Sequence, residues 1–127
     1  MPHYFSLEEA DVAVQVIKPI MADVMVIRQE IIDNQPDAWP VIEKAAGNGG
    51  SKAASLLARS FERLDALVHK ILDTGVLLKD INSGLFDFPA WRDDHEVYLC
   101  WKYGEPRIAY WHEIEAGFAG RQPIDTL

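Results

Sequence analysis

The chain contains one cysteine, Cys100, and no run of lysine or arginine residues. A single cysteine excludes an internal disulfide and fits a reducing cytosol. Lysine and arginine number 12 against 20 aspartate and glutamate residues, so the formal charge is −8 at pH 7. An acidic surface repels phosphate groups, and we therefore expect neither a nucleic-acid partner nor a membrane partner.

Long hydrophobic stretches are also missing. No apolar run approaches the length that spans a bilayer, and the first residues lack the basic and apolar regions of a secretion signal. The 127 residues, 49% of them hydrophobic and 25% charged, have the composition of one globular domain. We expect a single cytoplasmic domain covering residues 1–127.

The first part of the sequence has the spacing of a long helix. Ser6 and Glu9 form a capping-box pattern, in which each side chain accepts a hydrogen bond from the other residue's backbone N–H. Pro19 lies inside the pattern, and we expect it to kink the helix without ending it. The helix should end before Pro36, because a proline disfavours helical geometry in the residue before it. Apolar side chains recur every three or four residues, at Leu7, Ala10, Val14, Ile17, Met21, Val24 and Ile31.

A second amphipathic segment follows a glycine-rich turn. We expect a short helix from Trp39 to Ala46, a helix cap at Ser51 and a left-handed stop at Gly75. The two long helices, joined by one loop, should pack as an antiparallel hairpin over about residues 6–74. The apolar positions of the second helix are Ala54, Leu57, Phe61, Leu64, Val68 and Ile71.

In the last third of the chain the spacing changes to that of β-strands. We expect strands at residues 85–88, 97–102 and 107–112, separated by turn residues. Residues 76–78 also have the composition of a short strand. The predicted fold class is α+β: a long antiparallel helical hairpin followed, over about residues 76–127, by a small three-stranded antiparallel β-meander and an irregular glycine-containing tail.

The turn at residues 103–106 predicts a register for the last two strands. It places Cys100 opposite Ala109. In that register Cys100 and His112 point to opposite faces of the sheet, which argues against a nucleophilic Cys–His pair. We therefore interpret Cys100 as a small buried apolar side chain.

The strand that ends at His112 and the tail after it carry the candidate ligand or partner surface. In a structural interpretation, His112 bonds the tail backbone and Arg121 pairs with a carboxylate such as Asp87. In a functional interpretation, Arg121 binds an anionic ligand or an acidic partner peptide. The tail glycines let the chain fold back onto the sheet, with Phe118 as an apolar anchor. The candidate surface consists of Asp87, Trp111, His112, Glu113, Phe118 and Arg121.

The sequence contains no complete catalytic set, so we assign no catalytic residue. Its four histidines and one cysteine are spread along the chain without the short spacings of a structural zinc site. We therefore expect no metal ligands and no cofactor.

Several segments together resemble a known family. They are residues 5–10 (Phe-Ser-Leu-Glu-Glu-Ala), 84–90 (Gly-Leu-Phe-Asp-Phe-Pro-Ala), 99–102 (Leu-Cys-Trp-Lys), 110–113 (Tyr-Trp-His-Glu) and 117–124 (Gly-Phe-Ala-Gly-Arg-Gln-Pro-Ile). The chain resembles, over nearly its whole length, the prokaryotic family catalogued as domain of unknown function 2203. The resemblance implies a small bacterial or archaeal cytoplasmic protein with a helical hairpin and a small sheet, and it implies no assigned activity. It also points to the sheet and tail as the functional surface.

Two functions from different classes fit the sequence. The first is a non-enzymatic binding or interaction module that acts as a homo-oligomer, most simply a homodimer, and binds an unknown protein or small ligand. Oligomerisation is expected because one hairpin and one small sheet cannot cover both sides of the apolar run Val24–Ile27. An exposed aromatic patch would favour this function, and a concave site with a perturbed acid or base would favour an enzyme. The alternative is a small enzyme or metal-binding protein whose site consists of His112, Asp87, Glu113 and Arg121.

Overall fold

The computed structural model describes residues 3–47 and 58–127 and combines helices with an antiparallel sheet, so the α+β prediction is confirmed. The chain divides into two compact units. The sheet unit comprises residues 1–18 and 74–127, and the helical unit comprises residues 19–73. The division falls within the first helix, α1 (Leu7–Asn34), and not between a hairpin and a meander. Within the described ranges, no helix is long and apolar enough to cross a membrane.

Helix α1 begins at the predicted cap and continues past Pro19. The backbone N–H of Ser6 donates to Glu9 Oε1 at 2.8 Å, and the N–H of Glu9 donates to Ser6 Oγ at 3.1 Å, which confirms the capping box. The bond from Ser6 lowers the pKa of the Glu9 carboxyl, because it favours the ionised form. The predicted apolar positions Ala10, Val14, Ile17, Met21, Val24 and Ile31 are buried, whereas Leu7 is 36% exposed.

The helical unit contains more than a two-helix hairpin. After the second half of α1 come a 3₁₀ helix, η1 (Pro36–Ala38), the short helix α2 (Trp39–Ala45) and helix α3 (Ala58–Leu72). The short helix predicted from Trp39 is therefore confirmed. The predicted cap and the first apolar positions of the second long helix, Ser51, Ala54 and Leu57, lie outside the described residues.

Apolar side chains from all three helices form the core of the helical unit. The apolar run Val24–Ile27 is predicted to need cover on two sides. Val26 in this run is 56% exposed to solvent. Gly47 and Gly75 have φ values of +83° and +97°, and the left-handed stop predicted at Gly75 is confirmed. The buried core consists of Met21, Val24, Ile27, Ile31, Trp39, Ile42, Phe61, Leu64, Val68 and Ile71.

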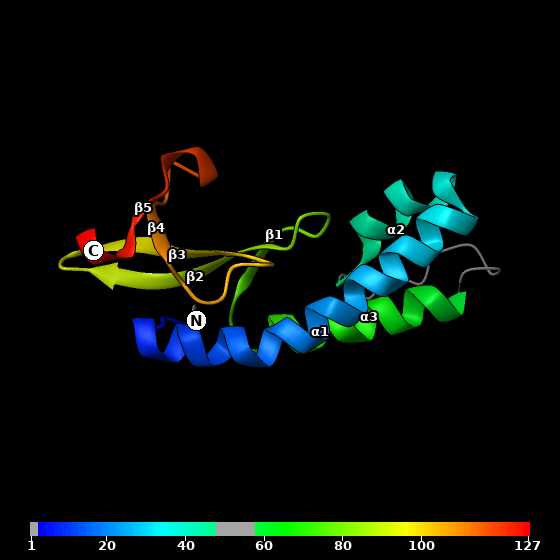
Figure 1. Cartoon of the computed structure of the whole chain (residues 1–127), viewed down its shortest axis with the longest axis horizontal. Coiled ribbons are helices and arrows are strands. Elements are labelled where there is room, and N and C mark those ends of the chain that lie inside the picture. The colour runs from blue at the N-terminus through cyan, green and yellow to red at the C-terminus, as the bar shows by residue number, and fades with distance from the viewer. Residues whose placement is uncertain (1–2, 48–57) are drawn as a thin grey trace. The chain divides into compact units, whose positions relative to one another are not determined.

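The sheet has five strands, and the prediction of three is wrong (Figure 1). Each strand is antiparallel to the next along the chain, so the meander topology is retained. The two additional strands lie at the edges: β1 overlaps residues 76–78, whose composition is that of a short strand, whereas β5 has too few residues to show alternation in sequence. The strands are β1 (Leu77–Asp80), β2 (Leu85–Arg92), β3 (His95–Lys102), β4 (Tyr110–Glu113) and β5 (Gln122–Pro123).

Strands β3 and β4 pair one residue away from the predicted register. Cys100 lies opposite Tyr110 and not opposite Ala109. The connection is longer than a tight turn because the backbone N–H of Ile108 donates to Asp11 Oδ1 on α1, at 2.8 Å, instead of to β3. The shift of one residue moves every β4 side chain to the other face of the sheet.

One face of the sheet is apolar and packs along the first half of α1 (Figure 1). The ring of Phe5, just before α1, lies edge-on to Phe88 with centroids 5.1 Å apart. The other face carries the polar side chains Asp87, Cys100 and His112, since cross-strand partners share a face. The buried residues of the apolar face are Phe86, Phe88, Ala90, Val97, Leu99, Trp101 and Trp111.

Candidate functional site

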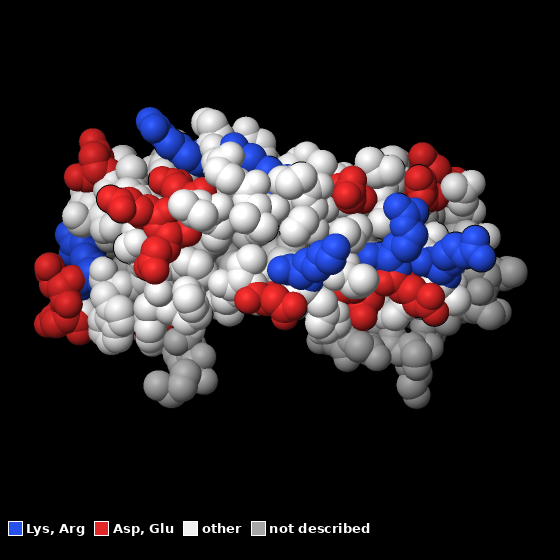
Figure 2. All heavy atoms as spheres, turned by 90° about the horizontal axis from the view of Figure 1, so that it is seen from below, with Lys and Arg blue, Asp and Glu red and all other residues white. Residues whose placement is uncertain are grey.

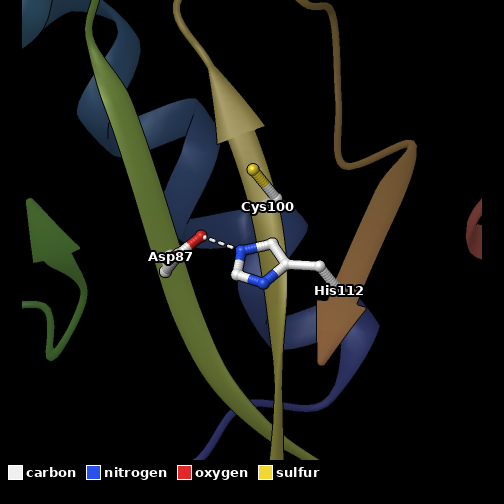
Figure 3. A group of neighbouring side chains, drawn as sticks. All are labelled: Asp87, Cys100 and His112. Atoms are coloured by element: carbon white, nitrogen blue, oxygen red, sulfur yellow. Dashed lines mark hydrogen bonds and ion pairs between the residues drawn. The ribbon is translucent and has the colours of Figure 1, made fainter. Parts of the chain in front are cut away.

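Three polar side chains from three neighbouring strands meet on one face of the sheet (Figure 3). Asp87 on β2 lies directly opposite Cys100 on β3, and His112 reaches toward both from β4. One ligand-type atom from each residue lies within 4.8 Å of the others. Asp87, Cys100 and His112 are 4%, 0% and 2% exposed. The prediction that Cys100 and His112 occupy opposite faces is wrong, because it rested on the register that the structure corrects.

The hydrogen bonds of His112 define where its protons are. Nδ1 lies 2.8 Å from the backbone carbonyl oxygen of Glu113, which can only accept, so Nδ1 carries a hydrogen. Nε2 lies 2.9 Å from Asp87 Oδ1. In a neutral imidazole this Nε2 has a lone pair, and it faces a carboxylate oxygen that also has lone pairs. A hydrogen must therefore lie between Nε2 and Oδ1, and Asp87 and His112 share it in one hydrogen bond.

Cys100 is poorly suited to act as a nucleophile. Burial, with the nearby Asp87 carboxylate, raises the pKa of the Cys100 thiol to about 12. The residue is therefore a protonated thiol at neutral pH, and the thiolate is the reactive form of cysteine. The interpretation of Cys100 as a small buried side chain is confirmed.

Two of the predicted site residues point away from this cluster. Trp111 lies on the apolar face, where its indole N–H donates to Thr126 Oγ1 at 3.0 Å. The guanidinium of Arg92 lies 4.8 Å from the centroid of a Trp111 ring. Glu113 also belongs to that face, and its Oε1 lies 2.9 Å from Nε2 of His95.

The tail residues Arg121 and Phe118 form a separate contact. Arg121 Nη2 donates to both carboxylate oxygens of Glu105, at 2.8 Å each, so the predicted pairing of Arg121 with Asp87 or His112 is wrong. The guanidinium also stacks 4.0 Å from the Tyr110 ring centroid and 4.6 Å from that of Phe118. Phe118 is 45% exposed and is therefore no buried anchor. Of the six predicted residues, only Asp87 and His112 bond to each other through their side chains.

The structure contains an acidic hollow that the sequence interpretation missed. Its volume is about 380 Å³. Nε2 of His95 lies 2.9 Å from Glu113 Oε1, and its Nδ1 lies 3.3 Å from Asp94 Oδ1. These carboxylates raise the pKa of His95 above its usual range, with the Asp94 hydrogen bond as the largest cause. The hollow is lined by His95, Glu96, Glu113, Ile114 and Glu115.

An aromatic surface adjoins the acidic hollow and comprises Tyr4, Trp91 and Tyr98. Trp91 is 54% exposed, and its ring centroid lies 5.2 Å from that of Tyr4. Trp91 is paired across the strands with Glu96, which belongs to the hollow. Burial and the Glu96 carboxylate raise the pKa values of Tyr4 and Tyr98, so both phenols lie within reach of that charge. The sequence signal was the run of aromatic, acidic and histidine residues at positions 91–96.

The geometry defines a class of protein: a small α+β protein whose antiparallel meander buries an Asp–Cys–His cluster and exposes an aromatic and acidic surface. A protein-family model described as "Uncharacterized conserved protein (DUF2203)" matches residues 3–124. The chain therefore belongs to the family of domain of unknown function 2203. Neither the comparison with curated proteins nor the comparison with solved structures found a match.

Replacing Arg121 with lysine should lower the free energy of unfolding by about 1 to 2 kcal/mol, because an ammonium cannot bond both oxygens of Glu105 and stack flat on Tyr110. Urea unfolding followed by circular dichroism measures the loss. Arg59→Lys, at an exposed position of α3, is the matched control and should change stability by much less. Equal unfolding midpoints for Arg121→Lys and the wild type would contradict a clamp between tail and turn.

Proposed function

We propose that the protein is a binding module that recognises a basic segment of a partner protein through the aromatic surface and the acidic hollow. The single observation that carries the proposal is the exposed Trp91, which lies next to Tyr4 and opposite Glu96. An enzyme that uses His112, Asp87, Glu113 and Arg121 together receives less support, since Glu113 and Arg121 do not join Asp87 and His112, and Cys100 is a protonated thiol.

Exposure of a tryptophan on a sheet is what a recognition surface requires. A large apolar ring in water is unfavourable, and burying it against a partner removes that cost. Tryptophan and tyrosine are the residues that contribute most often to binding energy at protein interfaces. Trp91 and Tyr4 supply such rings side by side, and the hollow next to them supplies a recess for a side chain.

Charge selects a basic partner. The protein has a formal charge of −8, and three glutamates line the hollow. Figure 2 shows acidic side chains gathered at the left, on the side of the view where α1 begins in Figure 1. The Nζ of Lys79 lies 5.2 Å from the ring centroid of Tyr98, so a ring of the aromatic surface already accepts an ammonium from the chain itself. Complementary charge accelerates encounter and sets specificity.

A labelled lysine-rich peptide should bind the full chain, and an acidic peptide of the same length should not. Trp91→Ala and Glu96→Gln should each weaken binding of the lysine-rich peptide by about tenfold, because one removes the stacking ring and the other removes charge from both surfaces. Fluorescence anisotropy measures the affinity. Val41→Ala, at a 58% exposed apolar position in the helical unit, should bind like the wild type. Failure of the wild type to bind, or equal affinities for all variants, would refute the proposal.

Binding of the same peptide should tighten as the pH rises from about 6 to about 8. The pKa of His95 is raised, so at the lower pH its imidazolium offsets the negative charge of Asp94 and Glu113. Deprotonation of His95 as the pH rises through that pKa leaves the carboxylates of the hollow uncompensated. His95→Gln should flatten the pH profile. A wild-type profile that is flat or falls over this range would contradict the assignment of the hollow as the peptide's charged contact.

We also propose the homodimer that the sequence predicted, with α1 as its contact. Val26 is 56% exposed and belongs to the apolar run Val24–Ile27 that the sequence predicts to need cover. Light scattering should give a mass of twice 14.3 kDa. Val26→Glu should reduce the mass to one chain without unfolding it, because Val26 lies outside the core. A wild-type mass of one chain at all concentrations would exclude the dimer.

A further inference from the structure

We propose that Asp87, Cys100 and His112 form a binding site for a zinc ion. The site lies on the same face of the sheet as the aromatic surface, but it is independent of the proposed recognition of a basic segment. Its side chains are buried, so it is a site for an ion within the protein rather than for a partner.

The donor set matches the chemistry of zinc. Zinc in proteins takes cysteine sulfur, histidine nitrogen and carboxylate oxygen, and the cluster offers one of each. Magnesium and calcium prefer oxygen ligands and would leave the thiol and imidazole unused. A thiolate and a carboxylate together carry two negative charges, which balance those of Zn²⁺ in a place where net charge is costly.

His112 already has the orientation of a zinc ligand. Histidines that bind a metal through one ring nitrogen commonly donate the hydrogen of the other to a carbonyl or carboxylate. Nδ1 of His112 lies 2.8 Å from the carbonyl oxygen of Glu113 and donates to it, which fixes the ring and directs Nε2 toward Asp87 (Figure 3). This bond is independent of the clustering of the three residues, and it leaves Nε2 as the ring nitrogen available to a metal ion.

Zinc would replace two protons. Binding removes the proton that Asp87 and His112 share and the proton of the Cys100 thiol, and both are released to solvent. The cluster is neutral before binding, because Asp87 and His112 share one proton and Cys100 is a thiol. It is neutral afterwards, as Zn²⁺ with one carboxylate, one thiolate and one neutral imidazole. The exchange therefore balances in charge and leaves no uncompensated ion in the sheet.

Zinc binding requires the three ligand atoms, which lie within 4.8 Å of one another, to adjust their separations. Nε2 of His112 and Oδ1 of Asp87 are 2.9 Å apart, and ligand atoms around a tetrahedral zinc ion are separated by about 3.3 Å or slightly more. Side-chain rotation can supply the difference, since all three residues project from adjacent paired strands. Three protein ligands leave the fourth tetrahedral position for a water or another small donor.

The expectation of no metal rested on the spacing of the histidine and cysteine residues along the chain, and that spacing does not reveal this site. The three ligands are separated by 13 and 12 residues, and only the antiparallel pairing of three strands brings them together. In the predicted register His112 would have faced away from Cys100.

Metal-free full chain, prepared with a chelator, should bind one equivalent of Zn²⁺ in a competition titration with a chromophoric chelator. Cobalt(II) added in place of zinc should give a thiolate-to-cobalt charge-transfer absorption. Because Cys100 is the sole cysteine, this absorption in the wild type identifies the ligand without any substitution. Cobalt bound without that absorption, or zinc bound at well below one equivalent, would overturn the proposal.

Cys100→Ser and Asp87→Asn should each weaken zinc binding by tenfold or more, and Cys100→Ser should lose the charge-transfer absorption. His69→Gln is the matched control, because His69 also lies beside a carboxylate, that of Asp65, but in the helical unit and outside both proposed sites, and it should bind zinc like the wild type. Circular dichroism identifies a variant that fails to fold, and the wild-type cobalt spectrum then decides the question. Unchanged zinc affinity in folded Cys100→Ser would also refute the site. None of these outcomes depends on peptide binding.

Discussion

The hydrogen bond between Asp87 and His112 reaches across β3 and joins three strands of the sheet. Side chains alternate along a strand, so a slip of one residue in either pairing would move one of these groups to the apolar face beside α1. There a carboxylate or an imidazole would be buried without a partner, which costs roughly 2 kcal/mol or more. The bond therefore fixes the register of β2, β3 and β4 together.

That register also decides which side chains reach the surface together. Trp91 and Glu96 are cross-strand partners on the same face as Asp87, so the aromatic surface and the buried cluster share one side of the sheet. Tyr98 lies between them, with its ring centroid 5.6 Å from that of His112. The opposite face supplies the apolar core against α1, and the hollow lies at the strand ends, where it takes Glu96 from one face and His95 and Glu113 from the other.

The buried polar cluster contributes more to the specificity of the strand register than to the free energy of unfolding. Replacing a buried ion pair with apolar residues of similar size is often neutral or stabilising, whereas removing one partner is costly. The shared proton keeps Asp87 and His112 neutral as a pair, and a bound divalent cation would do the same. Stability comes instead from the apolar face and from contacts that tie the chain ends to the sheet, such as Arg121 with Glu105.

Local sequence determined the elements that depend on neighbours in the chain. The capping box of Ser6 and Glu9, the apolar positions of α1, the short helix at Trp39 and the stop at Gly75 each rest on interactions within a few residues, and periodicity predicted them. The presence of strands at the centre of the sheet was equally readable, because alternation in a long strand is a local pattern.

Tertiary structure decided the register and therefore the site. Asp11 on α1 binds the backbone N–H of Ile108, and this contact between residues 97 positions apart lengthens the connection before β4. Edge strand β5 exists only because β4 offers it a partner. The sequence could supply Asp87 and His112 as candidates, but it assigned His112 to the wrong face and Arg121 to the wrong carboxylate. Strand pairing is set by hydrogen bonds between distant segments, which no local periodicity records.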